Sequence, residues 1–153
     1  MVEYYETLFN ITGLPVLFGW ITLIFFPKSK LTAKVYELPL IPAFFALCYS
    51  AVVMPTLFKN PEAMATLSNP TLYDVKNLLS TLGGATAGWI HFLCFDLLVG
   101  SFIWKKAIER SYSFYWVSPT LFCTLMLGPL GWLIFETIRF TKSFRSKRTS
   151  ENF

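Results

Sequence analysis

The fold of this chain is decided by the stretch Ala85-Thr-Ala-Gly-Trp-Ile-His-Phe-Leu-Cys-Phe-Asp-Leu-Leu-Val-Gly-Ser-Phe-Ile-Trp104. It matches the roughly 20 apolar residues that a membrane-spanning helix needs. Two ionisable residues, His91 and Asp96, lie inside it, and His91 is the only histidine of the chain. A charged carboxylate near the middle of a bilayer costs about 2.5–3.5 kcal/mol on insertion scales, so Asp96 needs a local reason to be there. This helix is therefore the first candidate site.

The composition excludes an ordinary soluble domain. The 153 residues are 54% hydrophobic, 18% aromatic and only 14% charged, whereas about 25% of the residues of a soluble domain are charged. The net charge of +4 suits anionic lipid headgroups better than nucleic acid. No interleaving of basic and aromatic residues indicates a surface for stacking bases. We expect membrane lipids as partners and no nucleic acid.

Apolar runs separated by prolines, glycines and charges predict four membrane spans and no separate soluble domain. The spans and the basic tail cover about residues 8–26, 36–57, 85–104, 114–140 and 141–153. The prediction is an all-α integral membrane protein, a four-helix bundle that forms a single transmembrane domain over residues 1–153. Gly128-Pro129 predicts a bend in the fourth span, because a proline removes a helix hydrogen bond.

The connection between the second and third spans, residues 59–82, is less apolar. Asn69-Pro70 is typical of a helix start. The helical spacing of the apolar residues that follow predicts a short amphipathic helix, which lies at the membrane interface or leads directly into the third span. The sequence leaves open whether this helix lies flat or covers a lateral opening.

Four crossings place both termini and the 59–82 connection on one side of the membrane. That side carries seven basic residues: Lys59, Lys76, Arg139, Lys142, Arg145, Lys147 and Arg148. The other side carries six: Lys28, Lys30, Lys34, Lys105, Lys106 and Arg110. The positive-inside rule decides little between seven and six, although the dense tail favours termini on the cytoplasmic or stromal side.

His91 and Asp96 cannot pair directly, because five residues at about 100° each place them about 140° apart around a helix. A joint site needs other helices around the third span or a ligand that reaches both. Gly84-x-x-x-Gly88 offers a small-residue surface for close helix approach on the side of His91. If the fourth span returns antiparallel, His91 lies level with Pro129, and a carbonyl freed by the break accepts its imidazole N–H.

Each candidate also has a purely structural interpretation. His91 is either a packed, hydrogen-bonded histidine or a residue for acid–base work or ligation. A carboxyl group in an apolar interior without a cation favours its neutral, donating form, so Asp96 is either a proton donor or a structural partner for Asn10 and Thr12. Glu136 lies three residues before Arg139, which predicts a surface ion pair.

The absence of several known motifs excludes some classes of catalytic site. The chain has no Gly-rich phosphate loop, no HExxH and no Ser–His–Asp spacing, and one histidine is too few for a di-iron membrane oxygenase. Cys48, Cys94 and Cys123 lie in separate apolar runs and are interpreted as packing residues. We therefore predict no metal site and no cofactor that catalysis requires, while the many aromatic rings suit a long, flat ligand.

Three segments together resemble the neoxanthin-synthase-like family over about residues 8–140. They are Asn10 with Gly19-Trp-Ile-Thr-Leu-Ile-Phe-Phe-Pro27-Lys-Ser-Lys-Leu-Thr32, Ala87-Gly-Trp-Ile-His-Phe-Leu-Cys-Phe-Asp-Leu-Leu-Val-Gly100, and Leu127-Gly-Pro-Leu-Gly131 followed by Arg139. The family usually has an arginine after the second motif, where this chain has Ser101, so no anion clamp is expected there.

The resemblance implies a small multi-pass protein of the thylakoid or bacterial inner membrane. The plant members are needed to make neoxanthin from violaxanthin, but many bacterial members occur where neoxanthin does not, so the substrate is not fixed. Opening a xanthophyll epoxide to an allenic alcohol needs an acid at the oxygen and a base at a polyene-adjacent C–H. The predicted enzyme is a cofactor-free carotenoid isomerase with Asp96 as acid and His91 as base.

The alternative is a non-enzymatic pigment-binding subunit or assembly factor of a membrane photosynthetic complex. In that protein His91 ligates a chlorophyll magnesium or holds the bundle together. Under both interpretations we expect a bound carotenoid or chlorophyll in a slot along the third span, lined by Trp89, His91 and Phe95.

Overall fold

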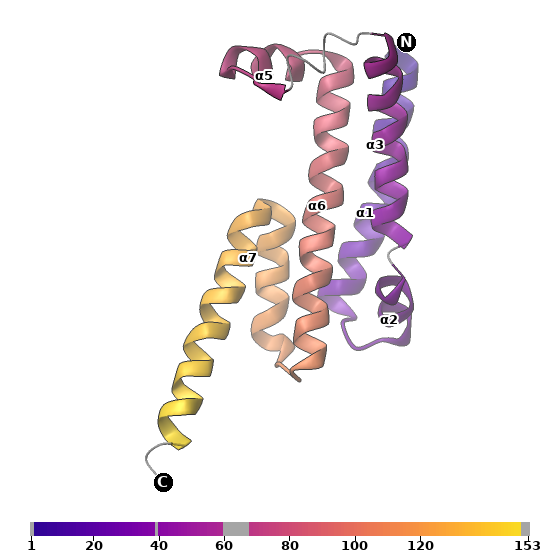
Figure 1. Cartoon of the computed structure of the whole chain (residues 1–153). Helices are drawn as coiled ribbons and strands as arrows, with labels where there is room; N and C mark the ends of the chain where they lie inside the picture. Colours follow the sequence, from indigo (N-terminus) through magenta and orange to yellow (C-terminus); the bar gives the residue numbers. More distant parts are fainter. Residues whose placement is uncertain (1, 39, 60–67, 151–153) are drawn as a thin grey trace. The chain divides into compact units, whose positions relative to one another are not determined.

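The computed structural model describes residues 2–38, 40–59 and 68–150, all of whose regular structure is helical. The helices are α1 (Val2–Phe25), α2 (Lys30–Glu37), α3 (Leu40–Lys59), α5 (Leu72–Leu79), α6 (Leu82–Glu109) and α7 (Phe114–Ser150) (Figure 1). Four of them are long and apolar enough to cross a membrane: Val2–Phe25, Leu40–Phe58, Leu82–Glu109 and Phe114–Lys142. The predicted all-α architecture with four candidate spans is confirmed.

Several predicted boundaries differ from the structure. Helix α1 begins at Val2 rather than at residue 8, and α6 covers Leu82–Glu109 rather than residues 85–104. The second span begins at Leu40 rather than at residue 36, because the preceding residues form the separate helix α2. Helix α2 ends at Glu37, two residues before Pro39 in the sequence. The residue before a proline is biased away from helical geometry. The short helix between spans is present as α5, but Thr71 rather than Asn69 is its N-cap.

Contacts divide the chain into two compact units, residues 1–19 with 38–95 and residues 20–37 with 96–153. Helices α1 and α6 each contribute to both units. The prediction of a single domain over the whole chain stays a prediction.

The first unit packs the beginning of α1, helix α3 and the first half of α6. Phe45 and Ile90 are fully buried in it. The Tyr4 hydroxyl donates a hydrogen bond to the Ala51 carbonyl at 2.8 Å, and the Cys94 thiol lies 3.6 Å from the Pro42 carbonyl. These bonds connect α3 to both neighbouring helices.

A tight corner joins α5 to α6. The Thr81 hydroxyl donates to the Leu78 carbonyl at 2.8 Å and accepts from the Gly84 amide at 3.0 Å. A β-carbon on Gly84 would collide with the Leu78 carbonyl oxygen, so the corner requires glycine at this position. Figure 1 shows the result, with α5 lying across the direction of α6.

The second unit holds the end of α1, helix α2, the second half of α6 and helix α7. Thr32 of α2 is fully buried and donates to the Phe26 carbonyl at 2.6 Å, which caps the end of α1. The Trp104 indole N–H donates to the Pro27 carbonyl at 2.7 Å, and the Ser118 hydroxyl donates to the Ile24 carbonyl at 2.9 Å. The last turns of α1 therefore meet both α6 and α7.

Helix α7 reverses direction. Leu127 and Gly128 have non-helical dihedral angles, which confirms the predicted break. Beyond the break the chain folds back on itself. The stacking of the Trp116 and Phe135 rings, whose centroids are 5.5 Å apart, shows this reversal. In a straight helix these two residues would be separated by about 28 Å. The sequence predicted a bend, and the structure has a helical hairpin whose arms lie side by side (Figure 1).

Candidate functional site

His91 lies on α6 in the first unit, beside an aromatic residue from each of two helices. Its ring stacks on Phe95 with centroids 4.5 Å apart, and Tyr49 of α3 lies with its ring 5.7 Å away. Within the described part of the chain the imidazole makes no hydrogen bond. The imidazole therefore has both its N–H donor and its unprotonated nitrogen free to meet a ligand.

A cavity of about 570 Å³ opens beside His91 within the first unit. Its volume is in the range of small-molecule sites. Most of its surface is apolar. Its walls come from the start of α1, from α3, from α5 and from the first turns of α6: Val2, Tyr5, Tyr49, Val52, Val53, Thr56, Leu57, Leu78, Leu79, Thr81, Leu82, Gly83, Gly84, Ala87, Gly88 and His91.

Few polar groups in this cavity are free to act on a ligand. The Thr56 hydroxyl donates to the Val52 carbonyl at 3.1 Å, and Thr81 is engaged in the corner. The remaining polar side chains of the lining are Tyr5, Tyr49 and His91, which make no hydrogen bond among the described residues. The cavity therefore offers two phenols and one imidazole in an apolar surrounding.

The small-residue surface around Gly84 and Gly88 was predicted to allow close approach of a helix. In the first unit α5 packs on it: a β-carbon on Gly88 would lie 3.1 Å from the Leu79 side chain. The glycines thus leave room for α5 and for the cavity below it.

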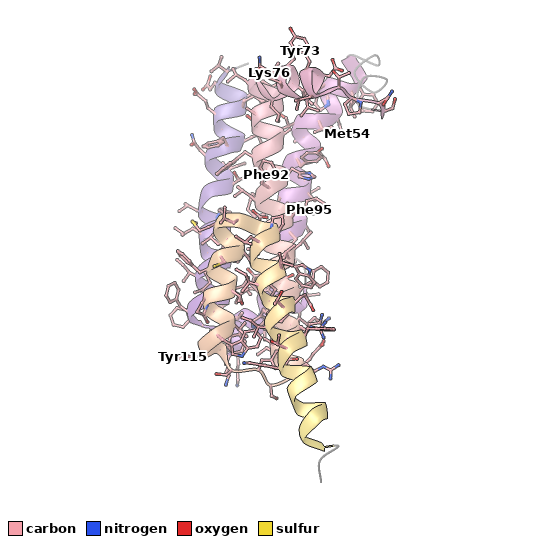
Figure 2. The ribbon with its side chains drawn as sticks, turned by 90° about the vertical axis from the view of Figure 1, so that its left-hand side faces the viewer. Met54, Tyr73, Lys76, Phe92, Phe95 and Tyr115 are labelled. Atoms are coloured by element: carbon pink, nitrogen blue, oxygen red, sulfur yellow. The ribbon has the colours of Figure 1, made fainter. Side chains whose placement is uncertain are left out.

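The three residues predicted to contact a pigment lie in different surroundings. His91 lines the cavity, and Phe95 continues the same face of α6 through its stacking contact. Trp89 pairs with Phe9 of α1, with ring centroids 5.7 Å apart, and is not part of the cavity lining. Phe92 and Phe95 are 59% and 54% exposed and point outward from α6 (Figure 2). Pigment contact at these residues stays a prediction.

Asp96 belongs to the second unit and is half-buried there. Its carboxyl group lies against Gly128, where a β-carbon would collide with Oδ1. The break in α7 therefore packs against Asp96. The Thr12 hydroxyl donates to the Phe9 carbonyl of its own helix at 2.7 Å, and its pairing with Asp96 stays a prediction. The structure describes the surroundings of His91 and Asp96 separately, one in each unit, and a joint site stays a prediction.

No group of three or more His, Cys, Asp or Glu side chains in the described ranges is placed to hold a metal ion. A pigment metal held by one axial ligand would need only His91. Tyr5 and Tyr49 are the polar cavity residues that the sequence analysis missed. The stripe Tyr49, Val52, Val53 and Thr56 has helical spacing, but α3 is apolar on all sides and nothing in its sequence indicates which stripe meets a cavity.

These features define a multi-pass helical membrane protein with an apolar cavity that presents a histidine and two tyrosines. The model of the ABA4-like family, described as ABA DEFICIENT 4-like, matches residues 7–135. The chain belongs to this family, which is linked to neoxanthin synthesis. No curated protein and no solved structure matches it.

Proposed function

We propose that the first-unit cavity binds the ring end of an epoxy-xanthophyll and that the protein isomerises it in a thylakoid or bacterial inner membrane. The observation that carries this proposal is the free imidazole of His91 beside the free phenol of Tyr49 in an apolar cavity. Both groups face the same space, so one ligand ring can meet an acid and a base together.

The reaction transfers protons and involves no net oxidation. His91 accepts the proton of the polyene carbon next to the ring, and the electron pair of that C–H bond forms the new allene double bond. The epoxide C–O bond breaks, and its oxygen receives a proton from an acid. We assign this role to Tyr49, because it lines the same cavity as His91. A proton that returns from the imidazolium to the phenolate restores the enzyme, and the product is an isomer of the substrate.

The dimensions of the cavity fit one end of such a ligand. A carotenoid is too long to be enclosed, so only its ring lies inside. The polyene leaves along the exposed rings of Phe92 and Phe95 (Figure 2), both of which are in ring contact with His91. An extended apolar chain can pack against these two rings, because exposed aromatic rings on a membrane span also pack against lipid chains.

The second candidate function is pigment binding without catalysis. It is favoured by the surface exposure of His91 and by its lack of a hydrogen-bond partner in the described ranges, because an axial ligand of a chlorophyll magnesium needs a free nitrogen. Such a subunit would carry chlorophyll or carotenoid within a larger membrane complex.

The test is conversion of violaxanthin by the protein reconstituted in liposomes, followed by chromatographic separation of the products. We expect His91→Ala and Tyr49→Phe each to lower the rate by a factor of about 10²–10⁴, the usual contribution of a positioned acid or base. Ser50→Ala and Ser101→Ala are the matched controls on α3 and α6, because each serine donates only to a carbonyl of its own helix.

Two other outcomes reassign the roles. If Asp96→Asn abolishes conversion while Tyr49→Phe does not, Asp96 is the acid, as predicted from the sequence. If the protein converts violaxanthin and no variant lowers the rate, none of these residues is the acid or the base. If the protein converts nothing, catalysis is excluded. A chlorophyll absorption band that is lost in His91→Ala then supports the pigment-binding function.

A further inference from the structure

The hairpin in α7 raises the question of whether this helix crosses the membrane at all. Three contacts pair residues on either side of the break: Thr124 with Gly131, Trp116 with Phe135, and Trp116 with Lys142. Lys142 Nζ lies 4.3 Å from the centroid of the Trp116 ring. The end of the second arm has therefore returned to the level at which the first arm began.

The same level is marked by the end of α6. Lys106 Nζ lies 2.9 Å from Glu136 Oε1, and Arg139 pairs with the other oxygen of Glu136, which confirms the ion pair predicted from the sequence. Lys106 also stands over the ring of Trp132 at 5.4 Å. Tryptophans beside basic side chains are typical of a membrane–water interface. Both arms of the hairpin therefore end at one interface, next to the end of α6.

Basic residues give an independent indication. Without a fourth crossing, the 26–39 connection, the 110–113 connection and the tail lie on one side, and the N-terminus with the 59–81 connection lies on the other. Eleven of the thirteen basic residues then share a side: Lys28, Lys30, Lys34, Lys105, Lys106, Arg110, Arg139, Lys142, Arg145, Lys147 and Arg148. Only Lys59 and Lys76 lie opposite. Four crossings give seven against six, whereas three crossings follow the positive-inside rule clearly.

We propose that α7 is a re-entrant hairpin that enters and leaves the membrane on the same side, and that its two ends form with the end of α6 a surface for anionic phospholipid headgroups. The exposed Arg110 and Lys142 border this surface, and the ring of Trp116 beside Lys142 suits the headgroup region. The side that carries it is the cytoplasmic or stromal one. The two termini then lie on opposite sides of the membrane.

Topology is tested by labelling single cysteines in sealed, oriented vesicles with an impermeant maleimide, after replacement of the three native cysteines. We expect Ser113→Cys and Ser146→Cys to react from one side and Ser80→Cys from the other. Reaction of Ser146→Cys on the same side as Ser80→Cys would overturn the hairpin proposal. Trypsin cleavage of the unmodified chain in the same vesicles gives the same information if the cysteine-free chain does not fold: Arg110 and Arg145 should be cut from one side.

The lipid surface is tested by the retention of phosphatidylglycerol and phosphatidylcholine on the purified protein in native mass spectrometry. We expect several-fold preferential retention of phosphatidylglycerol, and we expect Arg110→Gln combined with Lys142→Gln to remove the preference. Lys76→Gln on α5 is the matched control and should keep it. Equal retention of both lipids by the unmodified protein, or an equal loss in the control, would refute the surface.

Discussion

Gly13 and Gly128 are both glycines in long apolar helices, but their surroundings differ. A β-carbon on Gly128 would collide with the Asp96 carboxyl group, whereas one on Gly13 would meet nothing within 4 Å. Asp96 thus occupies the space that a side chain at position 128 would fill. This contact links α6 to the reversal of α7 within the second unit.

We expect Gly128→Ala to destabilise the protein by about 1–3 kcal/mol, the usual range for overpacking. Gly13→Ala should be neutral or stabilise by up to about 1 kcal/mol, because alanine favours helix more than glycine does. Denaturant unfolding in detergent micelles measures both. Asp96→Ala should recover part of the loss in Gly128→Ala, as residues in contact are energetically coupled. Equal effects of the two glycine substitutions would contradict the contact.

His91 and Asp96 could be singled out from the sequence because ionisable residues are rare in apolar runs. The residues that surround them in the structure could not be predicted. The approach of Tyr49 to His91 depends on the register between α3 and α6, and a helix that is apolar on all sides carries no signal of its orientation. The pairing of Glu136 with Arg139 was predictable because both lie within one helical turn.

The start of α5 is defined by a reciprocal pair of hydrogen bonds. The Asp74 amide donates to the Thr71 hydroxyl at 3.2 Å, and the Thr71 amide donates to the Asp74 carboxylate at 3.0 Å. This reciprocal capping box satisfies amides that have no partner inside the helix. The hydrogen bonds from Thr71 hold the pKa of the Asp74 carboxyl below its usual value of 3.8.

We expect Thr71→Ala to increase amide hydrogen exchange across Leu72–Leu79 several-fold, since the loss of an N-cap weakens a helix start. Ser80→Ala at the other end is the control, because the Ser80 hydroxyl only donates to the Lys76 carbonyl of its own helix. A carboxyl whose pKa is lowered by folding contributes stability above its unfolded value and loses it as the pH falls through the folded value. Protection of α5 should therefore fall below about pH 3.8. Unchanged protection in Thr71→Ala would refute the cap.

The elements were predictable where composition changes along the chain and not where only geometry changes. The apolar runs indicated four candidate spans, and the spacing of Leu72, Val75 and Leu79 indicated α5. Helix α2 was missed because Tyr36 continues the apolar run of the second span. The hairpin was missed because Gly128-Pro129 is compatible with both a bend and a reversal. Contacts across the break, such as the stacking of Trp116 on Phe135, decide for the reversal.

At the scale of the whole molecule, ligand binding and stability are linked. A ligand that binds only the folded state stabilises it by about 2.7 kcal/mol at a concentration of 100 times its Kd. The cavity is lined by residues from four helices, so ligand binding should shift the unfolding transition of the protein. This readout is independent of turnover and therefore separates binding from catalysis.

We expect violaxanthin to raise the midpoint of thermal unfolding of the unmodified protein in detergent, and Ala87→Leu to abolish the rise by filling part of the cavity. Ala85→Leu is the matched control on the same helix, because Ala85 is exposed and does not line the cavity. Turnover should be lost in Ala87→Leu and kept in Ala85→Leu. His91→Ala should lose turnover but keep the violaxanthin-dependent rise of the unfolding midpoint. The reason is that apolar contacts should supply most of the binding of the ligand's ring end. The same measurement with chlorophyll gives the opposing outcome. If chlorophyll raises the midpoint of the unmodified protein but not of His91→Ala, and violaxanthin raises the midpoint of neither, the histidine is a pigment ligand and the isomerase proposal fails.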